Sequence, residues 1–560
     1  MKKNRPLIYE HIILDKKKMP AAAAKKRKSR SSKAKSKKLP EVTPNKWRML
    51  VGVSAISGAI MGLACPGIDQ WYLAWLGMVP FFLALSASSS IGFAALNGLA
   101  FGFVYNAIYF SWLLGLHPLG WLGFNEWQSM ALAGLSLAVV AGQQAIITAV
   151  FAALVKLMPL HGGFMPRQID NKWHLPSLIV VPLLWVLIEN KIGNSPALLG
   201  VPLSMLEYTQ YLEPAVMKMA SFIGGIGIGF LIVMCNVAIA GLISSSSKKF
   251  DWKSFASTTY SDSMRQALIV AVTILALIGL GSASTPNIAG GQTSFPKVPV
   301  SIVQSNLNIE IQKDKRHYGL SEVLGHNLNL LSQCPSGLVI LCENALPTFL
   351  KNQPLTLAAL ELAARAGNYN LVVGAIDKDN SGRIFNAAYG ITSGGNLVSN
   401  IYHKRNLVPI GEFTPQFMYY LPDFVQKLTN TQTGKGFSPG TTPAILHFGK
   451  EQNIAPLICF EILSPELATA SVRNGGQLLV NLADLGWFHK SIIGRQMIAC
   501  AITRAAETGR YVILAANTGP SAIVSPEGHV LKLSKSDTAM SLSGQAELRS
   551  GYTPFTLWFY

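Results

Sequence analysis

The chain has 560 residues, of which 50% are hydrophobic and only 13% are charged. Soluble globular domains carry about 25% charged residues, so the composition excludes an ordinary soluble protein and indicates a membrane protein. The length exceeds that of one typical domain, so two or more domains are expected. The six cysteines show no C-x-x-C spacing and predict no zinc site, redox motif or disulfide framework. We expect neither a metal nor a cofactor.

The positive charge is concentrated in the first 48 residues. The formal net charge of the chain is +19, and residues 1–48 hold 17 Lys or Arg against three acids. A segment this basic cannot bury a core, so we predict a disordered tail. Nucleic-acid binding is one interpretation of such a tail. We favour a cytoplasmic tail without a nucleic-acid partner, because a hydrophobic stretch follows directly and basic residues flank membrane spans on the cytoplasmic side.

Hydrophobic stretches follow the basic tail. A membrane span needs roughly 20 apolar residues, and seven stretches approach or reach this length. Residues 49–281 are therefore predicted to form a transmembrane domain of about seven helices. The stretches cover residues 49–68, 71–88, 91–116, 130–157, 178–189, 215–244 and 266–281.

The basic residues between these stretches predict the orientation. With the tail inside, the loop that carries Arg167 and Lys172 and the loop that carries Lys248 and Lys249 also fall on the cytoplasmic side. Lys191 is the one basic exception in an outer loop. An odd number of spans then places everything after the seventh stretch outside the cytoplasm.

The fifth stretch is short and ends in W-V-L-I-E, from Trp185 to Glu189. An acid within a membrane span or at its edge is a candidate functional residue. Glu189 could equally cap the span at the membrane interface, where polar anchors are common. Both interpretations stay open at this point.

The second part of the chain has a different pattern. Residues 282–297 are rich in Ser, Thr, Gly and Pro and are predicted to form a linker. Residues 298–560 alternate between strand-like and helix-like segments, which is typical of an α/β layered domain. Strands are expected at 298–306, 338–341 and 370–376, and helices at 319–333 and 355–366.

Three residues with catalytic chemistry lie at the ends of strand-like runs in this part. Glu343 follows G-L-V-I-L-C, Lys404 lies in I-Y-H-K, and Cys459 ends I-A-P-L-I-C. A thiol has a pKa of about 8.5 and needs a base or a positive charge nearby to react as a thiolate. Glu343 could accept the thiol proton, and Lys404 could stabilise an oxyanion together with the backbone N–H of Phe460. The trio predicts acyl transfer through a thioester.

Each of these residues has a simpler interpretation when taken alone. A lone buried Cys is usually part of a core, and most Lys and Glu side chains lie on the surface. The order acid, lysine, cysteine at three strand ends is what points to a shared site.

This order resembles the Glu-Lys-Cys triad of the nitrilase superfamily. The flanking L-V-P-I-G-E, which ends at Glu412, and C-F-E, which starts at Cys459, are similar to its membrane-bound branch, the apolipoprotein N-acyltransferases. N-L-A-D-L-G-W-F, R-A-A-E-T-G-R and A-N-T-G follow in the order of that family. The resemblance runs from about Trp47 to Tyr560. It implies a multi-pass α-helical membrane domain plus the four-layer α-β-β-α sandwich of nitrilases for residues 298–560.

The resemblance also implies an activity. A phospholipid would donate an acyl chain to Cys459, and the α-amino group of a lipoprotein's N-terminal diacylglyceryl-cysteine would accept it, in a ping-pong mechanism. The protein would lie in the bacterial plasma (inner) membrane as a monomer, with its catalytic domain on the periplasmic side. The alternative enzyme is a membrane-anchored amidase or nitrilase, in which water replaces the amine. A catalytically silent scaffold is the third interpretation, and the presence of all three triad residues argues against it.

Two further acids are candidates for a supporting role. By the resemblance, Glu412 is a second acid that orients Lys404, although it could be an exposed turn residue. Glu461 could support the surroundings of the thiol, or it could simply pair with Arg504 or Arg510.

Several aromatic residues are candidates for contact with substrate. Phe460 stands where the family usually has Tyr. Trp487 and Phe488 could form an apolar patch that receives acyl chains, or they could pack in the core. An apolar run after the lysine segment could form a lid on the membrane surface or a buried helix. This run contains Phe413, Phe417, Met418, Tyr419, Tyr420, Leu421 and Phe424.

Overall fold

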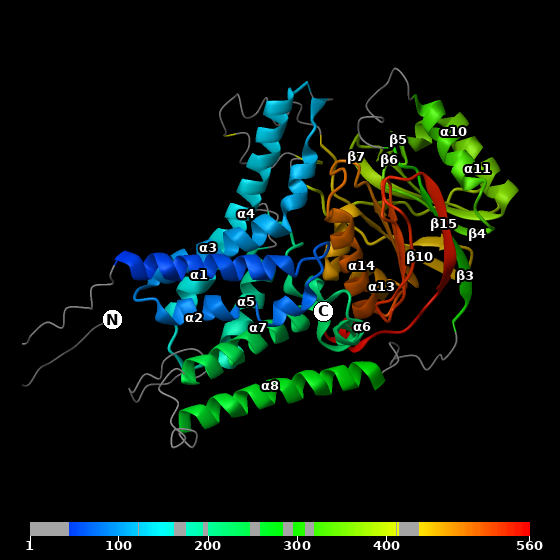
Figure 1. Cartoon of the computed structure of the whole chain (residues 1–560). Coiled ribbons are helices and arrows are strands. Elements are labelled where there is room, and N and C mark those ends of the chain that lie inside the picture. Colours follow the sequence, from blue (N-terminus) through cyan, green and yellow to red (C-terminus); the bar gives the residue numbers. More distant parts are fainter. Residues whose placement is uncertain are drawn as a thin grey trace, which may run out of the picture. The chain divides into compact units, whose positions relative to one another are not determined.

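The computed structural model contains helices in its first half and two β-sheets in its second half (Figure 1). The predicted basic tail, apart from its last residues, and most of the predicted linker lie outside the described residues. The described residues are 44–120, 123–161, 175–193, 200–246, 258–283, 295–307, 319–409, 411–413, 420 and 436–559.

Each of the seven hydrophobic stretches contains helical structure. Four helical segments are long and apolar enough to cross a membrane: Ile91–Tyr109, Glu126–Leu157, Ala220–Ser245 and Met264–Gly281. The chain is therefore a membrane protein, while the total of seven spans stays a prediction. The main helices are α1 (Pro44–Leu63), α2 (Val79–Ala87), α3 (Ile91–Tyr109), α4 (Glu126–Leu157), α5 (Ser177–Ile188), α7 (Ala220–Ser246) and α8 (Thr258–Ala283).

Short turns join these helices. They are η1 (Trp71–Trp75), η2 (Ser111–Leu116), the π-helical turn η4 (Glu189–Gly193), η6 (Leu206–Gln210) and α6 (Pro214–Met217). A two-residue strand pair, β1 (Leu160–His161) with β2 (Leu175–Pro176), lies between α4 and α5.

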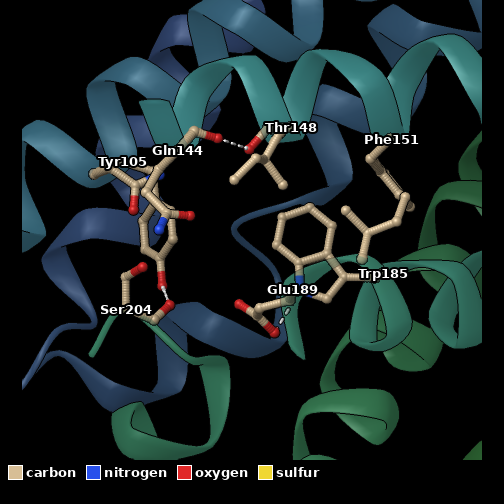
Figure 2. A pocket seen from close by; sticks show the side chains of 10 residues that line it. Tyr105, Gln144, Thr148, Phe151, Trp185, Glu189 and Ser204 are labelled. Atoms are coloured by element: carbon tan, nitrogen blue, oxygen red, sulfur yellow. Dashed lines mark hydrogen bonds between the residues drawn. The ribbon is translucent and has the colours of Figure 1, made fainter. Parts of the chain in front are cut away.

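Helices α3 and α4 pack closely because small residues lie between them. A Cβ added at Gly98 would lie 2.5 Å from the backbone oxygen of Thr148, and one added at Gly102 would lie 2.6 Å from the Thr148 hydroxyl. Such spacing of small residues lets the backbones of membrane helices approach each other. The close contact brings polar side chains of both helices, those of Tyr105, Gln144 and Thr148, into one region (Figure 2).

The second half forms two sheets. The first has the strand order β15-β3-β4-β6-β7-β8, with β5 (Leu346–Phe349) paired to β6, and the second has the order β14-β13-β12-β11-β10-β9. The strands of the first sheet are β15 (Met540–Glu547), β3 (Lys297–Gln304), β4 (Gly337–Leu341), β6 (Tyr369–Lys378), β7 (Ile384–Ile391) and β8 (Tyr402–His403). Those of the second are β14 (Val530–Leu533), β13 (Ala522–Val524), β12 (Val512–Ala516), β11 (Leu478–Ala483), β10 (Gln452–Ile458) and β9 (Leu446–Phe448).

The two sheets pack face to face between two helical layers (Figure 1). Helices α10 (Leu320–Leu331) and α11 (Pro354–Gly367) cover the first sheet, and α13 (Pro465–Arg473) and α14 (Ile493–Thr508) cover the second. Side chains of β4 alternate between the two cores, because successive residues of a strand face opposite sides. Leu338 and Ile340 join the core between the sheets, while Val339 and Leu341 join the core under α10 and α11. This arrangement confirms the predicted α-β-β-α sandwich.

Helix α14 also packs against the membrane helices. It contacts α7 and η6, and the side chain of Glu507 on α14 accepts a hydrogen bond of 2.7 Å from the backbone N–H of Gly225. Helix α7 is interrupted at Gly224, whose φ of 67° favours glycine. The ring of Phe555, in α15 (Pro554–Trp558), fills the space where a Gly224 side chain would lie. The sandwich and the membrane helices therefore share a packed core.

Candidate active site

Glu343 lies two residues after the end of β4, the strand paired between β3 and β6. Its side chain is 6% exposed. Oε1 accepts hydrogen bonds from Lys404 Nζ (3.1 Å) and Asn386 Nδ2 (2.8 Å), and Oε2 accepts one from the backbone N–H of Asp484 (2.8 Å). Three donors from separate parts of the fold therefore fix the carboxylate.

Lys404 follows β8, and its side chain is 1% exposed. Its ammonium lies 3.1 Å from Glu343 Oε1 and 2.9 Å from Glu412 Oε1. Burial alone would lower the pKa of Lys404, but the charges of Glu343, Cys459 and Glu412 raise it above its ordinary value. The lysine is therefore a fixed positive charge.

Cys459 follows β10 at the start of the turn η11 (Cys459–Leu463). Its φ of 55° lies in the left-handed region, which is uncommon for a residue with a side chain and often marks functional sites. Burial and the charge of Glu343 raise the pKa of the Cys459 thiol well above its ordinary value, and Lys404 lowers it. The charges of both Glu343 and Lys404 act on the thiol, so the three side chains lie in one cluster. In this arrangement a neutral thiol faces a carboxylate that can accept its proton.

Glu412 holds the lysine from the other side. Its Oε1 accepts from Lys404 Nζ and from Asn386 Nδ2 (2.9 Å), and its Oε2 accepts from the backbone N–H of Val408 (2.8 Å). The side chain is 11% exposed and points inward. The geometry is that of an orienting acid rather than of an exposed turn residue.

Glu461 is fully buried and ties two active-site segments together. Its carboxylate accepts hydrogen bonds from the backbone N–H groups of Arg405 (2.6 Å) and Ile458 (2.7 Å) and from the Tyr402 hydroxyl (2.8 Å). These contacts join the segment around Lys404 to the end of the strand that carries the cysteine.

The predicted alternative, a pairing of Glu461 with Arg504 or Arg510, is wrong. Arg504 pairs with Glu507 at 3.1 Å. Arg510 donates to the carbonyl oxygens of Gly476 and Gly551. Arg504 and Glu507 lie three residues apart on α14, a spacing that brings two side chains of one helix together.

An aromatic cluster connects the cysteine turn with the membrane helices. The Trp112 ring, in η2, meets the rings of Phe460 (6.3 Å between centroids) and Phe488 (4.7 Å) edge to face. Both phenylalanines are half-buried against the main core, and Trp487 is half-buried. Phe488 thus packs partly against the core, and a role of Trp487 and Phe488 in receiving acyl chains stays a prediction.

Two family models match the chain. One, a carbon-nitrogen hydrolase, matches residues 301–545, and the other, the N-terminal domain of apolipoprotein N-acyltransferase, matches residues 57–238. An apolipoprotein N-acyltransferase from Geobacter metallireducens is 28% identical over 506 residues, which are 89% of each chain. One from Haemophilus influenzae is 24% identical over 90% of each chain. In both its parts the chain is similar to the apolipoprotein N-acyltransferases.

Solved structures also match part of the chain. A Saccharomyces cerevisiae member of branch 10 is 17% identical, with 45% of this chain and 90% of that chain covered and a TM-score of 0.34. An amidase from Nesterenkonia sp. is 16% identical, with 48% and 96% covered and a TM-score of 0.33.

Two residues of this candidate site were not predicted from the sequence. Asn386 bridges Glu343 and Glu412, and its only signal is a polar residue inside the apolar run of β7. Trp112 reaches Phe460 from more than 300 positions earlier in the chain, and no local pattern marks it. Of the predicted lid, Phe413 and Tyr420 are described, and its other five residues lie outside the described residues.

Proposed function

We propose that this protein transfers an acyl chain from a phospholipid to the N-terminal amine of a diacylglyceryl-modified lipoprotein. The observation that carries the proposal is the Cys459 thiol beside the Glu343 carboxylate and the Lys404 ammonium. The names of the relatives and the match of residues 57–238 to the N-terminal domain of apolipoprotein N-acyltransferase support the substrates.

In the first half-reaction, Cys459 Sγ attacks the ester carbonyl carbon while its proton moves to Glu343. The negative charge that develops on the carbonyl oxygen is stabilised by Lys404 and by the backbone N–H of Phe460. Collapse of this intermediate breaks the ester C–O bond. The departing lysophospholipid alkoxide takes the proton from Glu343, which leaves an acyl-thioester on Cys459.

In the second half-reaction, the lipoprotein amine attacks the thioester carbonyl and gives a proton to Glu343. The C–S bond breaks, an amide forms, and Glu343 returns the proton to the departing sulfur. The enzyme is then unchanged, so the cycle is ping-pong and needs no cofactor. Glu412 keeps Lys404 in place through both steps, since its Oε1 accepts a hydrogen bond from the ammonium.

Four helices that are long and apolar enough to cross a membrane support a membrane location, where both proposed substrates would be found. We propose a monomer in the bacterial plasma membrane, with residues 298–560 on the periplasmic side. The alternative, a hydrolase of small amides, would use the same three side chains with water as the second nucleophile. The match of residues 57–238 to the membrane domain of the acyltransferases favours the transfer reaction.

A transfer assay tests the proposal. Purified protein is mixed with phospholipid and a synthetic peptide that begins with diacylglyceryl-cysteine, and the peptide is analysed by mass spectrometry. We expect one additional acyl chain in amide linkage at the α-amine, and none with the Cys459→Ala variant. Release of free fatty acid with an unmodified peptide would replace the proposal with the hydrolase.

A further inference from the structure

The strand that leads to Lys404 is short and lies at the edge of its sheet. β8 is two residues long, and β7 is its neighbour in the strand order. At Lys404 the backbone N–H donates to the carbonyl oxygen of Asn386 (2.8 Å), and the carbonyl oxygen accepts from the N–H of Gly440 (2.8 Å). An edge strand with this little pairing has a low local stability on backbone contacts alone. Side-chain contacts of β8 therefore contribute to the position of the lysine.

Successive residues of β7 and β8 face opposite sides of the sheet. Asn386 of β7 and Lys404 face the candidate site, and Tyr402 faces the core between the sheets. Phe385 of β7 and His403 of β8 face the other side, where their rings stack. His403, the residue before the lysine in the chain, thus lies behind the site.

Two contacts fix the His403 side chain on this outer face. Its Nε2 lies 2.7 Å from Oδ2 of Asp377, and its ring stacks on that of Phe385 with 4.1 Å between centroids and 9° between planes. Asp377 and Phe385 are buried, and His403 is half-buried. An ionised carboxylate only accepts hydrogen bonds, so Nε2 of His403 carries the hydrogen and donates it.

Asp377 is an ionised anchor in β6. Its Oδ1 accepts from the Tyr389 hydroxyl (2.8 Å) and lies 3.2 Å from Lys351 Nζ. Burial alone would raise the pKa of Asp377, but the hydrogen bonds from His403 and Tyr389 and the charge of Lys351 lower it to about 2. The strand order places β7 between β6 and β8. The contact with His403 therefore reaches across β7 and ties β8 to a central strand.

We propose that His403 and Asp377 are positioning residues for Lys404. Their contact on the outer face of the sheet fixes β8, so that the ammonium on the inner face stays between Glu343 and Glu412. The pair lies on the opposite face from the reacting groups and acts through the backbone. The proposal rests on the proposed function, in which Lys404 stabilises the oxyanion. A contact that served stability alone would leave the lysine in place in every variant that folds.

Alkylation of Cys459 by iodoacetamide tests the pair in the full-length protein. His403→Phe keeps a ring for the stack on Phe385 and removes the donor to Asp377. Because the charge of Lys404 lowers the pKa of the thiol, a displaced ammonium should slow alkylation at a given pH. We expect about threefold, less than in Lys404→Met, where the charge is absent. The kcat of acyl transfer should fall about tenfold.

Two further variants isolate the donated hydrogen bond. In His403→Gln a side-chain N–H remains available to Asp377, so alkylation and kcat should return close to the wild-type values. His447→Phe, at an exposed position on β9, is the matched control and should change neither. If His403→Phe does not fold, Asp377→Asn replaces a carboxylate by an amide with one acceptor oxygen, and it should slow alkylation in the same direction.

Folding of each variant is checked by thermal melting. Wild-type alkylation and kcat in folded His403→Phe would overturn the proposal, because the pair would then serve stability alone. Equal losses in His403→Phe and His403→Gln would also overturn it, because the donated hydrogen bond would not be what matters. Failure of the proposed function gives a different result. The wild type would then transfer no acyl chain, while the alkylation rates of Cys459 would still differ among the variants.

Discussion

Lys404 donates to Glu343 across 3.1 Å, and the same ammonium is shared with a second carboxylate, Glu412, at 2.9 Å. The buried cluster thus holds one cation for two carboxylates. This excess of negative charge is one reason why the pKa of Cys459 is raised rather than lowered. The nucleophile rests as a thiol, and its proton must leave during the attack rather than before it.

Replacing the two charged neighbours of the thiol should shift its pKa in opposite directions. Glu343→Gln removes a negative charge, so the pKa of Cys459 should fall and alkylation at a given pH should become faster. Lys404→Met removes a positive charge, so the pKa should rise and alkylation should become slower. Both variants should lose acyl transfer, Glu343→Gln by about 100-fold or more because the base is missing.

The measurement is the rate of iodoacetamide alkylation of Cys459 against pH, followed on its peptide by mass spectrometry. In the wild type the rate should keep rising with pH beyond 9, since thiolate forms only near the raised pKa. Glu322→Gln, at an exposed position on α10, is the control and should leave the profile unchanged. Shifts of both active-site variants in the same direction would contradict the cluster's electrostatics.

Lys404→Arg should be nearly as damaging as Lys404→Ala. The Lys404 side chain is 1% exposed, and its ammonium lies between two carboxylates. A planar guanidinium would be displaced from both carboxylates. Misplacement by about 1 Å can reduce activity about a hundredfold. The measurement is kcat of the transfer assay, with folding checked by thermal melting. Close to full activity in Lys404→Arg would mean that the lysine supplies only background charge.

Asn386→Ala should reduce activity without removing any charge. Asn386 Nδ2 donates to both Glu343 (2.8 Å) and Glu412 (2.9 Å), so its loss leaves the two buried carboxylates with fewer donors. We expect a fall in kcat of about 10- to 100-fold and a loss of stability of about 1–3 kcal/mol. Asn329→Ala, at an exposed position on α10, is the matched control. An unchanged kcat would show that the acids hold Lys404 without this bridge.

The orientation in the membrane can be tested by labelling. The positive-inside rule predicts that the segment after the seventh hydrophobic stretch is extracytoplasmic. An introduced Ser294→Cys should react with a membrane-impermeant thiol reagent on intact spheroplasts. A cysteine introduced at Ser29, in the basic tail, should react only after lysis. The reverse pattern would invert the proposed topology.

The positions of Glu343, Lys404 and Cys459 at strand ends were predictable from the α/β pattern, whereas their role as a catalytic triad stays a prediction. The layered fold was predictable from the alternation of elements together with the family resemblance. The contacts across layers were not predictable. Asn386 and Trp112 act through partners far away in the sequence, and Glu461 binds backbone N–H groups, which no sequence pattern reveals.

The most direct test of the central claim is the intact mass of the protein after incubation with phospholipid alone. Without an acceptor amine, the wild type should gain the mass of one acyl group, removable by neutral hydroxylamine, and should release lysophospholipid in a single burst. Cys342→Ser should keep the adduct, because Cys342 lies in the core under α10 and α11 while Cys459 lies in the core between the sheets. Cys459→Ala should show no adduct. An adduct that persists in Cys459→Ala, or continuous fatty-acid release by the wild type, would contradict acyl transfer through Cys459.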